Sequence, residues 1–244
     1  MIERQIEITT RAGRMNTFIS HPERGGPHPV ILFFMDAPGI REELRDMARR
    51  LASVGYYVML PNLYYRSGEE ELGAFVGEGA AAVREKMFSL MGTLTIDLVM
   101  DDADALIAFA DKDPAASRGP IGTVGYCMSG QYAVSAAARR PDRVTAAASI
   151  YGVRLITDQP DSPHLTARNG KAELYVAWAE TDHYAPLTEL EPFQAALRES
   201  GVEAEVELYR GVEHGFAFPQ RPAYDRDAAE RHWERLFDLF GRNL

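Results

Sequence analysis

The only cysteine of the chain, Cys127, lies in the segment GYCMSG, where an apolar run gives way to a helix-like pattern. A thiol in this position could act as a nucleophile, because the unpaired N–H groups at a helix N-terminus favour the thiolate form. Such a nucleophile needs a histidine that accepts its proton and usually a carboxylate that orients the histidine. The alternative is a buried structural cysteine beside a tight turn.

Two of the six histidines follow apolar segments that are typical of buried strands. His214 comes shortly after AEVELY, and His183 follows Asp182 just past AELYVAWAE. Parallel α/β sheets carry their sites at the edge where the strands end, so these loops are expected to converge. We predict His214 as the base and Asp182 as the acid, with His183 at the rim. The remaining histidines have structural or surface positions: His21 and His28 in a turn-rich segment, His164 in a loop, and His232 on an exposed face of the last helix.

Both assignments have structural alternatives. His214 could be a loop histidine that serves as a turn residue. Asp182 could be an N-cap or Asx-turn residue before the helix expected from residue 187, a position where aspartate is common.

The elements that must position these residues follow from the alternation of apolar runs and helix-like segments along most of the chain. This alternation predicts a doubly wound, mostly parallel sheet flanked by helices, preceded by two edge strands. The predicted strands are residues 4–10, 14–20, 30–34, 56–61, 121–126, 145–152, 172–180 and 204–209, and the predicted helices are residues 42–55, 95–113, 129–140, 187–201 and 223–241. Residues 62–92 are the least regular segment and are predicted to form an irregular rim or cap.

Cys127, Asp182 and His214 occur in the order nucleophile, acid, histidine, which is that of the α/β-hydrolase architecture. In this architecture the nucleophile stands on a sharp turn between a buried strand and a helix. GYCMSG fits that turn, except that Ser129 stands where the strict pattern Gly-x-nucleophile-x-Gly has its second glycine. We therefore predict an α/β fold of the α/β-hydrolase class, as a single domain over residues 1–244.

These segments together resemble the dienelactone hydrolase family, whose members use a cysteine nucleophile in a Gly-x-Cys-x-Gly-Gly turn. The resemblance spans almost the whole chain: TDHYAP looks like the acid segment of the family, EHGFAF like its histidine segment, and MDAPGI and PNLYYR like its post-strand segments. It implies a triad of Cys127, His214 and Asp182. It also implies an oxyanion hole formed by the backbone N–H groups of Met128 and Ala37, because acyl transfer requires donors aimed at the developing oxyanion.

The chain departs from the family next to the nucleophile. Where the type member of the family has a glutamate beside the resting cysteine, this chain has Asp36, which is one methylene shorter. The resemblance implies that Asp36 hydrogen-bonds near the thiol and modulates its ionisation. The alternative is a turn residue before Ala-Pro-Gly.

A second departure concerns the substrate. Family members that act on dienelactones hold the substrate carboxylate with two arginines. Arg84 falls where one of them is expected, although it could equally be an exposed helix charge, and Phe218 stands at the position of the other. Since losing a charge-assisted hydrogen bond weakens binding by about 1.5 to 3 kcal/mol, we expect a neutral, more apolar ester or lactone. Tyr64, Phe216 and Trp178 are further aromatic candidates for contact with it.

Composition limits the partners and the location of the chain. It has 244 residues, 46% of them hydrophobic, and a formal net charge of −10, which argues against a nucleic-acid or anionic-membrane partner. No apolar stretch approaches the roughly 20 residues of a membrane span, and the first residues lack the pattern of a secretory signal. We expect a cytoplasmic protein, monomeric or a small homo-oligomer, that acts on a small molecule without a metal or organic cofactor.

The sequence thus predicts a cysteine hydrolase that opens a small ester or lactone through a thioester intermediate. An acyltransferase or thioesterase on the same site would differ only in what donates or accepts the acyl group. A non-catalytic α/β-hydrolase scaffold that binds a ligand is the alternative from another class. A redox sensor built on Cys127 would need an external thiol, because the chain has no second cysteine.

Overall fold

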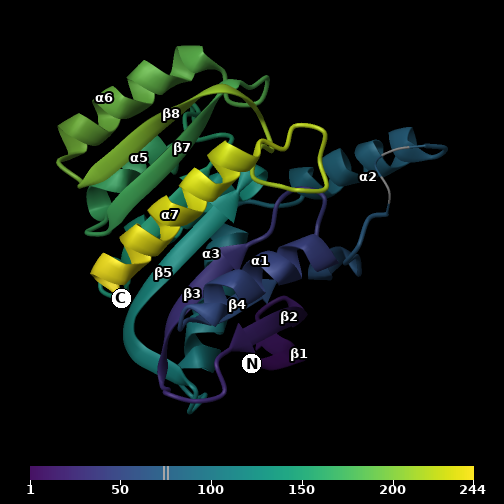
Figure 1. Ribbon diagram of the computed structural model, residues 1–244, viewed down its shortest axis with the longest axis vertical. Helices are drawn as coiled ribbons and strands as arrows, with labels where there is room; N and C mark the ends of the chain where they lie inside the picture. Colours follow the sequence, from purple (N-terminus) through teal and green to yellow (C-terminus); the bar gives the residue numbers. More distant parts are fainter. Residues whose placement is uncertain (74, 76) are drawn as a thin grey trace. The chain divides into compact units, whose positions relative to one another are not determined.

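The structure is a computed structural model that describes residues 1–73, 75 and 77–244. Within these residues the chain forms two compact units, Met1–Arg118 and Gly119–Leu244 (Figure 1). Strands alternate with helices in both units, as the sequence pattern predicts. The expectation that both belong to one domain stays a prediction. None of the described helices combines the length and the apolar character that a membrane span requires.

The first unit is built on strands in the order β1-β2-β4-β3. They are β1 (Ile2–Thr10), β2 (Gly13–His21), β3 (His28–Phe34) and β4 (Tyr57–Pro61). β1 and β2 form an antiparallel hairpin, β2 also pairs antiparallel with β4, and β3 and β4 are parallel. The prediction of β2 as an edge strand is therefore wrong. Its polar residues Thr17 and Ser20 are fully buried, so the alternation of polarity did not mark a solvent-exposed face.

Two helices of this unit form as their sequence patterns predict. α1 (Glu42–Ser53) connects β3 to the parallel β4 and buries an apolar face that includes Leu44 and Leu51. α3 (Ile96–Ala110) begins at Thr95, whose hydroxyl accepts a hydrogen bond from the Leu98 N–H at 3.2 Å. This cap satisfies one of the N–H groups that a helix start leaves unpaired.

The segment predicted as an irregular rim, residues 62–92, contains more regular structure than its sequence suggested. It includes the short 3-10 helix η1 (Tyr65–Ser67), a bridge between Glu71 and Gly39, and α2 (Ala80–Gly92). Residues 74 and 76 of this segment lie outside the described residues. Its function as a cap stays a prediction.

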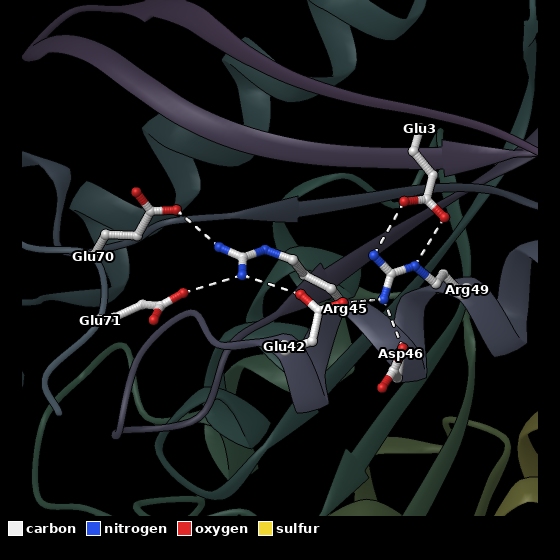
Figure 2. Close-up of polar contacts among 7 residues, drawn as sticks. All are labelled: Glu3, Glu42, Arg45, Asp46, Arg49, Glu70 and Glu71. Carbon is white, nitrogen blue, oxygen red and sulfur yellow. Dashed lines mark hydrogen bonds and ion pairs between the residues drawn. The ribbon is translucent and has the colours of Figure 1, made fainter. Parts of the chain in front are cut away.

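An ion-pair network surrounds α1. Arg45 and Arg49 each contact three carboxylates, at N···O distances between 2.5 and 3.4 Å (Figure 2). The partners of Arg45 are Glu42, Glu70 and Glu71, and those of Arg49 are Glu3, Glu42 and Asp46. The network ties α1 to β1 on one side and to residues 70–71 on the other. Because most of these carboxylates are exposed, each pair contributes little by itself and is weakened by salt.

The second unit is a parallel array of strands in the order β5-β6-β7-β8. Its strands are β5 (Ala116–Tyr126), which begins at the last residues of the first unit, β6 (Val144–Ile150), β7 (Glu173–Thr181) and β8 (Ala204–Glu213). Its helical segments are η2 (Cys127–Ser129), α4 (Gly130–Arg139), α5 (Pro163–Thr166), η3 (Ala167–Asn169), η4 (Leu187–Glu189), α6 (Leu190–Ser200) and α7 (Arg226–Asn243). α4 packs against β6, and α7 packs against β6 and β7.

Each strand of this unit is followed directly by a residue whose side chain could take part in a reaction. Cys127 follows β5, Tyr151 follows β6, Asp182 follows β7 and His214 follows β8. Parallel strands bring their carboxyl ends to one edge, which is where open α/β sheets bind ligands. The second unit therefore gathers these four side chains by topology alone.

Candidate active site

Cys127 stands on a sharp turn between β5 and α4. Its φ of 54° is left-handed, a conformation that costs a residue with a side chain about 1 to 2 kcal/mol. The turn also brings backbone segments very close together: a Cβ atom on Gly125 would lie 2.0 Å from the carbonyl oxygen of Ser129. Only glycine fits at position 125, so the first small residue of GYCMSG is a steric requirement of the turn.

A second close contact brings the first residue of α4, Gly130, against the end of β6 and the loop after it. A Cβ atom on Gly130 would lie 2.4 Å from the Cα of Gly152 and 2.3 Å from the hydroxyl oxygen of Ser149. Ser129, the departure from the glycine pattern, is fully buried with φ −91° and ψ −2°, a conformation open to any residue. The turn therefore needs glycine at positions 125 and 130 but not at 129.

Cys127 itself is only partly buried, unlike Tyr126 and Met128 on either side of it. Its carbonyl oxygen accepts a hydrogen bond from the Val153 N–H at 3.0 Å, which fixes the turn against the loop after β6. A strained residue that remains partly accessible is typical of a functional position and not of an inert core cysteine.

Asp182 makes the contacts of both positions that its sequence context suggested. One carboxylate oxygen, Oδ1, accepts hydrogen bonds from the N–H groups of Tyr184 at 2.8 Å and Ala185 at 3.1 Å, which is the predicted turn-forming role. The other, Oδ2, lies 2.6 Å from Nδ1 of His214. Because an ionised carboxylate only accepts hydrogen bonds, Nδ1 carries a proton and donates a hydrogen bond to Asp182. The imidazole is thus held with Nε2 directed away from the carboxylate.

The free end of His214 lies within electrostatic reach of Cys127. Nε2 is buried and has no hydrogen-bond partner of good geometry within the described residues. Burial lowers the pKa of the ring, but the charge of a Cys127 thiolate and the hydrogen bond to Asp182 outweigh it and raise the pKa of His214 to about 9. The surroundings of His214 therefore favour its imidazolium form at neutral pH.

Two tyrosines that the sequence analysis did not single out flank His214. The ring of Tyr151 lies 4.9 Å from the imidazole and is buried, and the ring of Tyr184 lies 5.1 Å from it and is 56% exposed. Tyr151 is also left-handed, with φ 38°. The signal for both was their position, since Tyr151 is one residue and Tyr184 is three residues past the end of a strand.

Three of the aromatic residues predicted to contact substrate are packed inside the second unit. Phe216 and Phe218 are fully buried and their rings lie 5.1 and 6.1 Å from that of Tyr151. Trp178 is also buried; its ring N–H donates to the carbonyl oxygen of Ala185 at 2.8 Å, and its ring lies 6.0 Å from Phe193. Their observed contacts are those of packing residues, and substrate contact by any of them stays a prediction.

The remaining predicted site residues belong to the first unit. Asp36 is fully buried and pairs with Arg41 at 2.6 Å, and Arg41 also contacts the buried Glu43 at 2.7 Å. Burial acts to lower the pKa of Arg41, but the two carboxylates raise it above its usual range, so its charge is permanent. Asp36 is therefore a carboxylate held by an arginine that its sequence context did not point to. Its expected effect on the thiol stays a prediction.

Tyr64 and Arg84 have local partners of their own. The buried Tyr64 hydroxyl donates to the carbonyl oxygen of Ala37 at 2.8 Å, so it fixes the loop that carries the expected oxyanion donor. Arg84 lies on α2, where its guanidinium donates to the carbonyl oxygen of Phe75 at 2.9 Å. The substrate-binding roles of both residues stay predictions.

The structure also tests the positions expected for two histidines outside the predicted triad. His183 is exposed, as a rim residue should be. His232, in contrast, is fully buried, so its prediction on an exposed face of the last helix is wrong. The charged residues around it in α7 suggested an exposed face, but its own ring packs beside Tyr126 and Phe216.

Comparisons with known proteins show similarity over nearly the whole chain. The model of the dienelactone hydrolase family matches residues 15–244. Relatives named "Putative carboxymethylenebutenolidase" include one from Methylorubrum extorquens, 29% identical over 244 residues, and one from Synechocystis sp., 27% identical over 230 residues. The matches cover 98% and 93% of this chain and 81% and 91% of the relatives, respectively.

The fold is likewise that of known structures. A crystal structure titled as a "Putative Dienelactone Hydrolase" from Klebsiella pneumoniae is similar with a TM-score of 0.87 at 24% identity, over 98% of both chains. The predicted α/β-hydrolase fold, a mostly parallel sheet flanked by helices, is confirmed. Since the family model spans nearly the whole chain, this hydrolase belongs to the dienelactone hydrolase family.

Proposed function

We propose that this protein hydrolyses a small carboxylic ester or lactone through a thioester on Cys127. One arrangement carries the proposal: a left-handed, partly accessible cysteine directly after β5, beside an imidazole whose Nε2 is buried and whose Nδ1 is hydrogen-bonded to Asp182. The names of the carboxymethylenebutenolidase relatives support this class of substrate.

In the first half of the reaction the Cys127 thiolate attacks the ester carbonyl. A tetrahedral oxyanion forms, and the Met128 N–H at the start of the helical turn is its expected first donor. The Ala37 N–H is proposed as the second donor only from the resemblance to the dienelactone hydrolase family. The imidazolium of His214 then gives its proton to the leaving alkoxide as the C–O bond breaks. The products are an alcohol, or the opened end of a lactone, and a thioester on Cys127.

In the second half, water hydrolyses the thioester. The neutral imidazole of His214 removes a proton from water, whose oxygen attacks the thioester carbonyl, and the thiolate leaves as the C–S bond breaks. Asp182 keeps the proton of His214 on Nδ1 throughout, so that Nε2 is the nitrogen that exchanges protons in both halves. The acyl group is released as a carboxylic acid, and the imidazolium and thiolate are restored.

Trapping of the thioester tests the proposal directly. Wild-type protein mixed with a panel of simple esters and lactones and quenched in acid should carry the acyl mass on Cys127, and Cys127→Ala should lose both the adduct and hydrolysis. An adduct that persists until an alcohol or thiol acceptor is added would indicate an acyltransferase. A mixed disulfide without hydrolysis would indicate a redox sensor, and full activity of Cys127→Ala would overturn the proposal.

The raised pKa of His214 predicts a specific pH dependence. Its imidazolium, the acid that protonates the leaving alkoxide, persists to a pH of about 9 and not only to 6.5. We expect kcat/KM for an alkyl ester to fall as the pH rises through about 9, because the acid form is then lost. The nitrophenyl ester of the same acid is the matched control, since nitrophenolate leaves without a proton and its rate should not fall there. Loss of alkyl-ester hydrolysis near pH 6.5 would contradict the prediction.

A further inference from the structure

His232 of α7 is fully buried and contacts the residue that precedes the nucleophile. Nδ1 of His232 contacts the carbonyl oxygen of Ala229, one turn earlier in α7. A carbonyl only accepts, so Nδ1 carries a proton, and in the neutral ring Nε2 is an acceptor. The hydroxyl of Tyr126 lies 3.1 Å from Nε2 and donates to it. His232 thus connects the backbone of α7 to a side chain of β5.

Tyr126 is the residue immediately before Cys127. It is fully buried, and its ring lies 5.3 Å from Phe218 and 5.9 Å from His232. The hydrogen bond from its hydroxyl therefore anchors the last residue of β5 before the backbone enters the left-handed conformation of Cys127. A strained residue persists only where its surroundings hold it, and this bond is one such restraint.

His232 also contacts the segment that carries the catalytic base. Its ring meets that of Phe216 edge-on at 6.2 Å, and Phe216 lies two residues after His214. A single buried side chain thus touches the neighbours of both Cys127 and His214. The separation between the thiol and the imidazole depends on how these two segments are held.

We propose that His232 is a positioning residue, which sets the separation of Cys127 and His214 through its hydrogen bond to Tyr126 and its ring contact with Phe216. It acts through other residues and does not touch the reacting atoms. The inference rests on the proposed function, because it assigns His232 a role in holding the thiolate beside the imidazolium.

Tyr126→Phe tests the inference with the smallest change, because it removes the hydroxyl and keeps the ring. We expect kcat to fall about 5- to 50-fold with KM unchanged within about twofold, since lost alignment of catalytic groups reduces turnover more than binding. We also expect the alkylation of Cys127 by iodoacetamide to require a higher pH than in wild type. His232→Phe should have an effect of the same size, and the double variant no larger one, because both changes break the same bond.

Tyr175→Phe is the matched control. Tyr175 is also buried in the second unit, and its hydroxyl bonds to Glu207 at 2.8 Å and Tyr209 at 2.7 Å. This variant should lower the melting temperature but leave kcat and the alkylation profile unchanged. If Tyr126→Phe behaves in the same way, the inference is wrong and the bond is only structural. This outcome differs from failure of the proposed function, in which Cys127→Ala would remain active. If His232→Phe does not fold, the result for Tyr126→Phe decides alone.

Discussion

His214→Ala is expected to lower kcat by at least about 1,000-fold, since members of a nucleophile–base–acid set act as a unit. Without the imidazole, the thiolate loses its charged partner and the leaving alkoxide loses the acid that protonates it. The variant also leaves Oδ2 of the buried Asp182 without its partner, which should lower the free energy of unfolding by about 1 to 3 kcal/mol. Steady-state kinetics and urea unfolding of the same preparation separate the two effects.

His183→Ala is the control for this prediction. His183 lies next to Asp182 in the chain but is exposed, so its removal should change kcat less than about twofold. Equal losses from the two variants would show that the base has been assigned to the wrong histidine. Retention of more than about a tenth of the wild-type kcat in His214→Ala would contradict the triad.

Gly125→Ala is expected to have the largest effect on stability. The added methyl group would meet the carbonyl oxygen of Ser129 at 2.0 Å, a contact with backbone that no side-chain rotation relieves. We expect the free energy of unfolding to fall by about 3 kcal/mol or more, and hydrolysis to be lost even in molecules that fold, because the turn must open to admit the group. Denaturant unfolding and the rate of Cys127 alkylation measure the two consequences.

Gly241→Ala is the matched control in the same unit. Gly241 lies on the exposed surface of α7. Apart from its chain neighbours and the helix backbone, no atom of the described residues lies within 4 Å of the position of an added Cβ. Since alanine is a better helix former than glycine, this variant should be more stable by up to about 1 kcal/mol and fully active. A similar loss of stability in both variants would show that the close contact at Gly125 is not the cause.

Much of the second unit could be predicted because local signals agreed with one another. The apolar runs that end before Cys127, Asp182 and His214 are strands, and the strand ends meet at one edge by the topology of parallel sheets. Gly125 and Gly130 likewise mark close approaches in the structure. Such features depend on residues near one another in the sequence or on a general rule of topology.

What could not be predicted depends on contacts between distant segments. His232 looked exposed because its neighbours on α7 are charged, and its partner Tyr126 is 106 positions away in the chain. The edge assignment of β2 failed in the same way, since small polar residues such as Thr17 can be buried once a second strand pairs alongside. The arginine that holds Asp36 is only five positions away, yet several arginines were within reach and the sequence does not distinguish them.

The two carboxylate oxygens of Asp182 have different partners, and this limits how the sequence can change during evolution. One oxygen closes the turn after β7 and the other orients His214, so the residue would still be required for folding in a descendant that had lost its nucleophile. Asparagine could not replace it fully, because an amide offers one acceptor oxygen where two are used. A homologue that keeps this aspartate therefore gives no sign of being an active enzyme. The same holds for Gly125, which the turn itself requires, whereas the thiol and the imidazole are free to change once catalysis is lost. Active and inactive homologues should therefore be distinguished by the residues at positions 127 and 214 together, and not by the residue at position 182.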